Sequence, residues 1–233
     1  MIGICASCGN YDWDKIVTEN EVICPKCGCR WGYKRLPVYF ISGFSGVGKT
    51  TAVQLIQQKT DEFVCLDADM FYNLMKPDTD EGYAAMVEQV LSLSKNISQC
   101  GKSAVWAMAG NLDKLAHAYG ARFFSEIRVL ALTVDEAELR RRMTEGRGIT
   151  DPNWIQSSVD YNHYFRTHEK IGDTPYEWID CTGCTPDEAA EYLQISKRTV
   201  LDLARRGDIP AQKVGGRWRF SPSQLASYMG ITT

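Results

Sequence analysis

The sequence of 233 residues lacks the features of an exported or membrane-spanning chain. Its start, Met1 to Cys5, has neither the basic residues nor the apolar core of a signal peptide, and no run of about 18 apolar residues occurs anywhere. We therefore expect a cytoplasmic protein with no membrane partner. Because thiols stay reduced in that compartment, the nine cysteines predict metal binding where they are closely paired, rather than disulfides.

A strong net charge is also missing. The chain has 26 Lys and Arg against 29 Asp and Glu, so it is not a polycation that would coat nucleic acid indiscriminately. The charge is uneven, however: residues 37–184 contain 14 basic and 20 acidic side chains, and residues 185–233 contain 7 and 5. Any DNA binding must therefore come from a local patch.

The sequence has no low-complexity stretch, long flexible linker or internal repeat, and its 44% hydrophobic content is typical of globular domains. Its motifs divide it into three segments with different chemistry, 1–36, 37–184 and 185–233. Because nothing resembling a tether separates them, we expect neighbouring segments to be in contact.

The first segment contains two Cys-x2-Cys pairs separated by fifteen residues, which is the spacing of a four-thiolate zinc site. A glycine follows each pair and permits the backbone to fold back toward the sulfur atoms. The segment resembles the zinc ribbon family over about 30 residues. The predicted ligands of a closed, structural Zn²⁺ site are Cys5, Cys8, Cys24 and Cys27, whereas Cys29 breaks the spacing.

The second segment begins with a predicted strand over 38–42, followed by a Gly-x4-Gly-Lys-Thr motif and a predicted helix. In this context the motif predicts a phosphate-binding loop for ATP, in which backbone amides and a helix N-terminus face the phosphates. Lys49 would neutralise the β- and γ-phosphates, and Thr50 would offer a hydroxyl to Mg²⁺. The predicted nucleotide-binding residues of the motif are Gly43, Gly46, Gly48, Lys49, Thr50 and Thr51.

A second predicted strand, 62–66, ends in Asp67-Ala68-Asp69. Ligands bind at the carboxyl edge of an open parallel sheet, so both carboxylates are candidates for the site. If strand geometry continues, they point to the same side. Asp67 would then complete the magnesium site, since the third predicted strand, 104–109, ends without a carboxylate, and Asp69 would meet the acceptor hydroxyl as base or orienting group.

A fourth predicted strand, 127–134, leads into a helix with three consecutive arginines and a loop with two glycines. Such a helix and loop suit a lid that closes over ATP. We predict that Arg142 and Arg147, on either side of the hinge at Gly146, stabilise the charge of the transferring phosphoryl group. Arg140 and Arg141 are expected on a solvated face with nearby glutamates.

Residues 37–184 thus resemble the small P-loop kinases typified by shikimate, gluconate and nucleotide kinases. The resemblance rests on the loop at Lys49, the Asp67-x-Asp69 pair and the arginine-rich helix. It implies an α/β fold, a five-stranded parallel sheet with helices on both faces. The full lid signature of shikimate kinases and the histidine after the gluconate-kinase lid are missing. The resemblance therefore does not identify the acceptor. Candidates for the acceptor pocket are Tyr72, Asn73, Asn111, Arg122 and Tyr161, each equally well explained as a surface or core residue.

The third segment reads as two short helices, from Thr185 and from Ser196, and then two alternating stretches around a Gly215-Gly216 turn. It resembles the excisionase-like and MerR-like winged helix-turn-helix domains. The resemblance implies binding of double-stranded DNA through Lys197, Arg198, Thr199, Arg206, Arg217 and Arg219. With so few basic residues, a single copy is expected to bind DNA weakly. Useful affinity would then require a homodimer or a second contact through the zinc ribbon. The same fold retained for protein docking is the alternative.

The leading functional hypothesis is a phosphotransferase that moves a phosphoryl group from ATP to a small molecule or a nucleotide. The second is a DNA-binding regulator gated by nucleotide, with little or no turnover, and the third is a kinase whose acceptor is a nucleic acid end. Asp69 separates the first two, because only a kinase needs an acceptor-side carboxylate. Cys181 and Cys184 form one further Cys-x2-Cys pair, whose spacing is best explained as coincidence.

Overall fold

The structure is a computed structural model that describes residues 2–182, 212–214 and 217–219. The chain divides into two compact units, 1–182 and 183–233, and each is considered by itself. Within the described residues, every helix is too short or too polar to cross a lipid bilayer.

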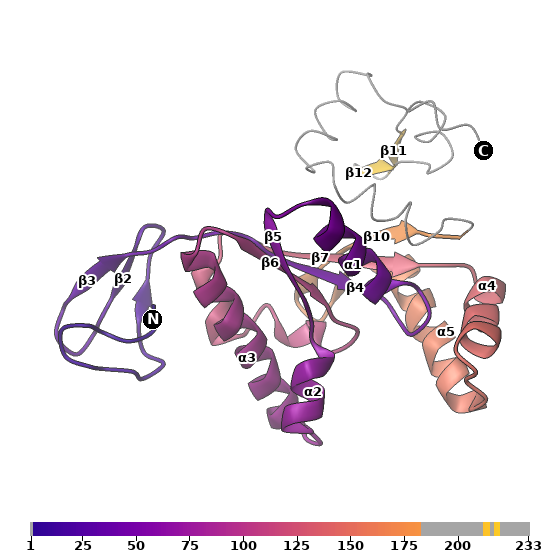
Figure 1. Ribbon diagram of the computed structural model, residues 1–233, viewed down its shortest axis with the longest axis horizontal. Coiled ribbons are helices and arrows are strands. Elements are labelled where there is room, and N and C mark those ends of the chain that lie inside the picture. The colour runs from indigo at the N-terminus through magenta and orange to yellow at the C-terminus, as the bar shows by residue number, and fades with distance from the viewer. Residues whose placement is uncertain (1, 183–211, 215–216, 220–233) are drawn as a thin grey trace. The chain divides into compact units, whose positions relative to one another are not determined.

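The first unit opens with a small antiparallel sheet of three strands in the order β1-β2-β3 (Figure 1). The strands are β1 (Ile16–Val17), β2 (Glu21–Ile23) and β3 (Arg30–Gly32). Two turns hold the cysteine pairs beside this sheet. Gly9 and Gly28 have φ angles of 71° and 73° and donate backbone hydrogen bonds to the carbonyls of Cys5 and Cys24, which confirms the predicted turns.

A five-stranded parallel sheet forms the centre of the unit, in the order β10-β7-β4-β6-β5. Its strands are β4 (Val38–Ser42), β5 (Phe63–Asp67), β6 (Ser103–Ala107), β7 (Ile127–Thr133) and β10 (Glu177–Asp180). The strand order brings the carboxyl ends of β4, β5 and β6 side by side at one edge, which is where ligands bind in such sheets.

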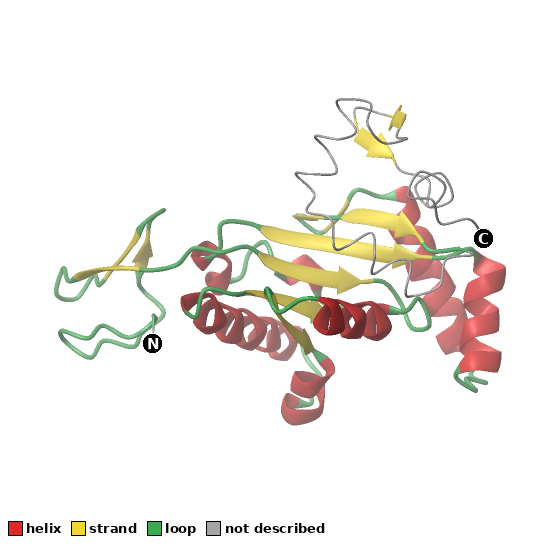
Figure 2. Cartoon of the chain, turned by 45° about the horizontal axis from the view of Figure 1, so that its top comes forward, coloured by secondary structure: helices red, strands yellow, loops and turns green. Residues whose placement is uncertain are grey.

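Both faces of this sheet are covered, and the strands lie between helices in Figure 2. Phe40 and Trp106 point to one face, where they join the core formed with helices α3 (Asp80–Gln99) and α5 (Pro152–Thr167). Helix α1 (Lys49–Lys59) packs along β4, β5 and β6 and buries Ala52, Val53 and Ile56. Near-continuous burial of strand residues is the pattern of a parallel sheet covered on both sides. The fold class expected for residues 37–184 is confirmed.

Four of the five strands were predicted within one or two residues of their observed bounds. The fifth, β10, had not been located, because its sequence Glu177-Trp-Ile-Asp180 is short and carries charges at both ends. Helix α2 (Asp69–Met75) was not predicted. The predicted arginine-rich helix is present and consists of α4 (Glu136–Arg141) and η3 (Arg142–Gly146), which is a π-helical turn. A two-residue hairpin, β8 (Lys170–Ile171) and β9 (Thr174–Pro175), precedes β10.

The cysteine-bearing segment packs directly on the P-loop domain, as the lack of a linker suggested. Ile2 and Val22 share a buried cluster with Phe123, which belongs to the short helix η2 (Tyr119–Phe123). The Gln99 side chain at the end of α3 exchanges two hydrogen bonds with the Lys34 backbone, at 2.9 and 3.1 Å. The ribbon therefore completes its core by burying side chains of its neighbour.

In the second unit the described residues form one antiparallel pair, β11 (Gln212–Val214) and β12 (Arg217–Arg219). Val214 pairs with Arg217 across the predicted Gly215-Gly216 turn, whose own residues lie outside the described part of the chain. The predicted strands of the wing are therefore present. The predicted DNA-binding residues Lys197, Arg198, Thr199 and Arg206 also lie outside the described residues.

Candidate functional site

The loop between β4 and α1 has a backbone that only glycine tolerates. Gly43, Gly46 and Gly48 have φ angles of 121°, 88° and 106°. A Cβ atom on Gly43 would lie 2.3 Å from the Leu132 carbonyl oxygen, and one on Gly46 would lie 3.3 Å from the Met143 side chain. The glycines thus let the loop pass close to β7 and η3, in the kind of backbone conformation that can direct amides toward phosphate oxygens.

Lys49 is the first residue of α1, and its ammonium group donates a hydrogen bond of 3.0 Å to the Phe44 carbonyl of the same loop. The pKa of this ammonium is lowered to about 8, chiefly by burial; nearby Arg147 contributes to the decrease, whereas Asp69 and Asp67 oppose it. The four charged side chains predicted to serve ATP, magnesium and the acceptor therefore interact electrostatically. They are Lys49, Asp67, Asp69 and Arg147.

Thr50 and Asp67 lie together, as the magnesium prediction requires. The Thr50 hydroxyl donates to an Asp67 carboxylate oxygen at 3.4 Å, and the other oxygen accepts the Asp69 backbone amide at 3.0 Å. Strand geometry does not continue through Asp69, however. Asp69 opens helix α2, so the expected two-residue alternation is wrong and the position of Asp69 is set by the helix instead.

The two predicted lid arginines occupy different elements, because only Arg142 lies within η3. Arg142 donates to Glu138 at 2.6 Å and to the Val47 carbonyl of the phosphate-binding loop at 3.4 Å. Arg147 follows η3, and the positive φ of the hinge belongs to Gly148 (66°) rather than to Gly146. Arg140 and Arg141 pair with Glu136 and Glu138, as expected for a solvated face.

Glu138 is a residue of this site that the sequence reading placed only on the solvated face. Its two oxygens accept hydrogen bonds from both Arg141 and Arg142, at distances from 2.6 to 2.9 Å. These arginines lower the pKa of the Glu138 carboxyl to about 2. The i,i+4 spacing to Arg142 was a signal that could have identified the pair.

The neutral candidates for the acceptor pocket come together in part. The Tyr72 hydroxyl accepts a hydrogen bond from the Asn111 side chain, and the Tyr161 hydroxyl donates to the Ala109 carbonyl at 3.3 Å. Asn73 is exposed on α2. Arg122 lies elsewhere: it stacks on Tyr119 and donates to the carbonyl of that residue, beside the ribbon, so its assignment to the pocket is wrong.

The four predicted zinc ligands form one cluster. Their sulfur atoms all lie within 4.8 Å of one another, with 3.6 Å between Cys5 and Cys27 and 3.7 Å between Cys8 and Cys24. A tetrahedral Zn²⁺ with bonds of about 2.3 Å places its sulfur ligands about 3.8 Å apart, so the observed spacing fits this ion. Cys29 is outside the cluster, as expected.

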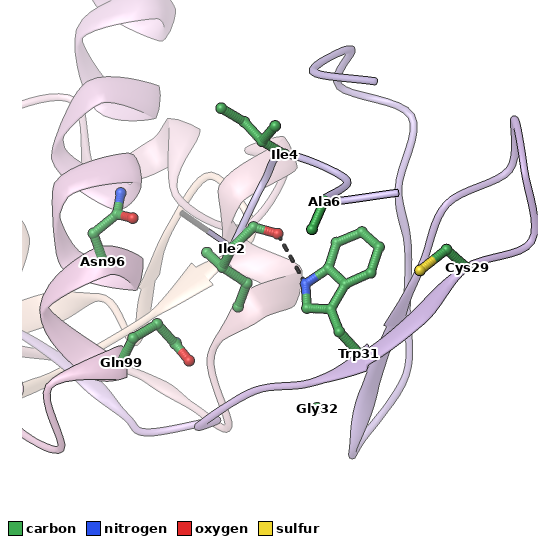
Figure 3. Close-up of a pocket in the computed structure, with 8 residues that line it drawn as sticks. All are labelled: Ile2, Ile4, Ala6, Cys29, Trp31, Gly32, Asn96 and Gln99. Atoms are coloured by element: carbon green, nitrogen blue, oxygen red, sulfur yellow. Dashed lines mark hydrogen bonds between the residues drawn. The ribbon is translucent and has the colours of Figure 1, made fainter. Parts of the chain in front are cut away.

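A hollow of about 490 Å³ lies between the cysteine-bearing segment and α3 (Figure 3). Ile2, Ile4 and Trp31 supply apolar walls, and Asn96 and Gln99 reach it from α3. The Trp31 indole nitrogen donates to the Ile2 carbonyl at 3.2 Å, so this polar group is satisfied within the protein. The hollow is separate from the phosphate-binding loop, and its lining includes no acidic or basic side chain.

Comparisons with known proteins give matches to both units of the chain. A family model described as a helix-turn-helix domain matches residues 184–230. A search of curated proteins found no match.

Two solved structures share the fold of the first unit. A sugar kinase from Janibacter sp. is 20% identical, with a TM-score of 0.52 over 74% of this chain and 97% of its own. A tunicamycin resistance protein from Deinococcus radiodurans is 17% identical, with a TM-score of 0.50 over 74% and 96% of the two chains. At these identities the likeness establishes the P-loop kinase fold, and activity has to be argued from the site.

Proposed function

We propose that this protein is an ATP-dependent phosphotransferase that acts on a small molecule and carries a zinc ribbon and a DNA-binding domain. The observation that carries the proposal is the meeting of the phosphate-binding loop, the Thr50–Asp67 pair and Asp69 at one edge of the sheet. A nucleotide-binding loop alone would need no second carboxylate. The likeness to a sugar kinase fold supports the same reading.

Each residue of the site has a role in this reaction. The amides around Gly43, Gly46 and Gly48 hold the phosphates, with Thr51 in the first turn of α1, and Lys49 offsets the charge of the γ-phosphate. Asp69 accepts the proton of the acceptor hydroxyl, while Arg142 and Arg147 stabilise the charge that spreads over the transferring group. ADP leaves when the bond from the γ-phosphorus to the bridging oxygen breaks.

The Thr50 hydroxyl and the Asp67 carboxylate would hold Mg²⁺. Both are hard oxygen ligands, which this ion prefers, and they already lie within 3.4 Å of each other. The ion would neutralise phosphate charge.

The decisive experiment measures MgATP binding and ADP release by wild-type protein and two variants. Lys49→Ala should weaken MgATP binding at least tenfold, because it removes the charge nearest the γ-phosphate. Asp69→Asn should preserve MgATP binding and lower acceptor-dependent ADP release about a hundredfold or more. Asp78→Asn, an exposed change in the loop before α3, is the matched control. Full turnover by Asp69→Asn would contradict the role of Asp69.

A second candidate is a regulator in which nucleotide binding changes DNA binding and turnover is slow or absent. The helix-turn-helix match at 184–230 and the paired strands that carry Arg217 and Arg219 favour a DNA-binding role for the second unit. The same assay distinguishes the candidates when DNA ends are included among the acceptors. A regulator releases no ADP with any acceptor, whereas a nucleic acid kinase responds only to the DNA ends.

A further inference from the structure

The acceptor side of the phosphate-binding loop is rich in carboxylates. Asp67 ends β5, Asp69 opens α2, and Asp113 lies in the short helix η1 (Leu112–Lys114) that follows β6. Asp69 raises the pKa of Tyr72, after the larger effect of burial, and Asp113 does the same for Tyr161. Asp69 and Asp113 therefore lie close enough to influence Tyr72 and Tyr161. These two tyrosines are held at this edge by hydrogen bonds with Asn111 and Ala109.

Several neutral groups lie beside these carboxylates. The Tyr72 and Tyr161 hydroxyls, the Asn111 amide and the Ala109 carbonyl can donate to or accept from hydroxyl groups of a ligand. Phe44 of the phosphate-binding loop packs against the Tyr161 ring in an edge-on arrangement, with 5.6 Å between the ring centres. This is a polar, partly aromatic surface of the kind that fixes the orientation of an uncharged polyol.

The described basic residues near this edge are already engaged or lie on the nucleotide side. The Lys114 ammonium bonds Asp80 at 2.6 Å and Asp113 at 3.4 Å. Lys49 and Arg142 contact carbonyls of the phosphate-binding loop, and Arg147, which follows η3, acts on Lys49 and so belongs to the nucleotide side. Lys76 lies beyond the C-terminal end of α2, about 10 Å along the helix from Asp69.

We infer that the acceptor is a hydroxyl-bearing molecule without negative charge, a polyol or amino-polyol, rather than a sugar acid or a nucleotide. This inference rests on the proposed phosphotransferase function. An anionic acceptor would bring its charge beside Asp69 and the Asp113–Lys114 pair, at a cost that a dedicated Arg or Lys would have to offset. A neutral acceptor meets only hydrogen-bonding groups, and an ammonium group gains from the carboxylates.

The transfer step balances with such an acceptor. The acceptor hydroxyl oxygen forms a bond to the γ-phosphorus as the bond to the β,γ-bridging oxygen breaks. The hydroxyl proton passes to Asp69, and ADP departs with the electron pair of the broken bond.

The test compares acceptors that differ in charge but share a carbon skeleton. Full-length protein with MgATP is given glucose, glucosamine or gluconate, and a nucleoside or its monophosphate, and ADP release is measured. Binding of each probe to protein loaded with a non-hydrolysable ATP analogue is measured in parallel. We expect the neutral or amino-bearing member of at least one set to exceed its anionic partner at least tenfold in kcat/KM or affinity.

A charge reversal tests the electrostatic argument within the chain. Asp113→Lys should shift the ratio of neutral to anionic acceptor at least tenfold toward the anion. Glu62→Lys, before β5 at the opposite end of that strand, should leave the ratio unchanged. Preference for an anionic member by wild-type protein, or binding of no neutral or amino-bearing probe while MgATP binds, would overturn the inference. Failure of MgATP to bind would instead contradict the proposed function.

Discussion

At the scale of single residues, Lys49 combines a position suited to phosphate with a pKa lowered to about 8, chiefly by burial. Below pH 8 the ammonium is charged and attracts ATP, and above it the charge is lost. Bound phosphates favour the charged form and raise the pKa again. We therefore expect kcat/KM for ATP to fall about tenfold per pH unit above pH 8, while kcat falls only at higher pH.

Initial rates of ADP release between pH 6.5 and 9.5 measure both profiles. Lys59→Met, at the other end of α1, is a matched control that should leave the profiles unchanged. A kcat/KM profile that stays flat to pH 9.5 would show that the free Lys49 does not titrate in this range.

In the proposed reaction Glu138 is a positioning residue, because it contacts Arg142 rather than the substrate. Glu138→Gln should release Arg142 from the orientation that also brings it to the Val47 carbonyl. We expect kcat to fall about tenfold with little change in KM for ATP, since the interaction matters most where charge develops in the transition state.

Glu136→Gln is the matched control for this prediction, because Glu136 pairs with Arg140 at 2.8 Å on the same helix, away from the loop. Steady-state kinetics of both variants decide the matter. Equal effects of the two substitutions would indicate that Glu138 contributes only to the stability of α4.

At the scale of elements, the cysteine-bearing sheet is small, lies beside the four-cysteine cluster and packs on the P-loop domain. Its strands are two or three residues long, and its apolar cluster includes Phe123 of η2. We predict one Zn²⁺ per chain and its loss from the double variant Cys24→Ser, Cys27→Ser. Without the metal the ribbon loses its closed turns, so the melting temperature of the whole first unit should fall by several degrees.

Elemental analysis and thermal melting measure the two effects. Cys29→Ser alters a thiol of the same segment that lies outside the cluster, so it should retain zinc and melt as the wild type does. An unchanged zinc content in the double variant would refute the ligand assignment.

Elements with a strong local signal were predictable from the sequence, and those fixed by tertiary contacts were not. The glycine-rich loop, the four long apolar strands and the cysteine turns each require particular residues at particular positions, as Gly43 illustrates. Strand β10 gives no such signal, because it is held by pairing with β7. Helix α2 has no buried residue, so periodicity could not distinguish it from a continuation of β5. Arg122 was assigned wrongly to the acceptor pocket, because nothing in the sequence shows that its partner, Tyr119, lies beside the ribbon.

At the scale of the whole molecule, the kinase-like fold and the helix-turn-helix match belong to separate parts of the chain. The acidic first unit holds the phosphate-binding loop, and the mildly basic segment 184–230 matches a helix-turn-helix family. A net charge of −3 gives little attraction for nucleic acid beyond this segment. DNA binding by the intact chain should therefore depend on few cations and on salt.

We predict that the full-length protein binds duplex DNA at low salt and that its affinity falls steeply as salt rises. Five basic candidates, Lys197, Arg198, Arg206, Arg217 and Arg219, give a slope of about −4.5 in log affinity against log salt if each one neutralises a phosphate. Arg217→Ala should weaken binding to all sequences and reduce the slope by about 1, whereas Arg198→Ala should reduce sequence preference. Titrations at two salt concentrations measure both, with Lys102→Ala in the first unit as the control.

Because a homodimer doubles the available contacts, a steeper slope would indicate two copies on the DNA. If the protein binds no duplex at low salt, the second unit docks a protein instead, and the regulator candidate loses its DNA target.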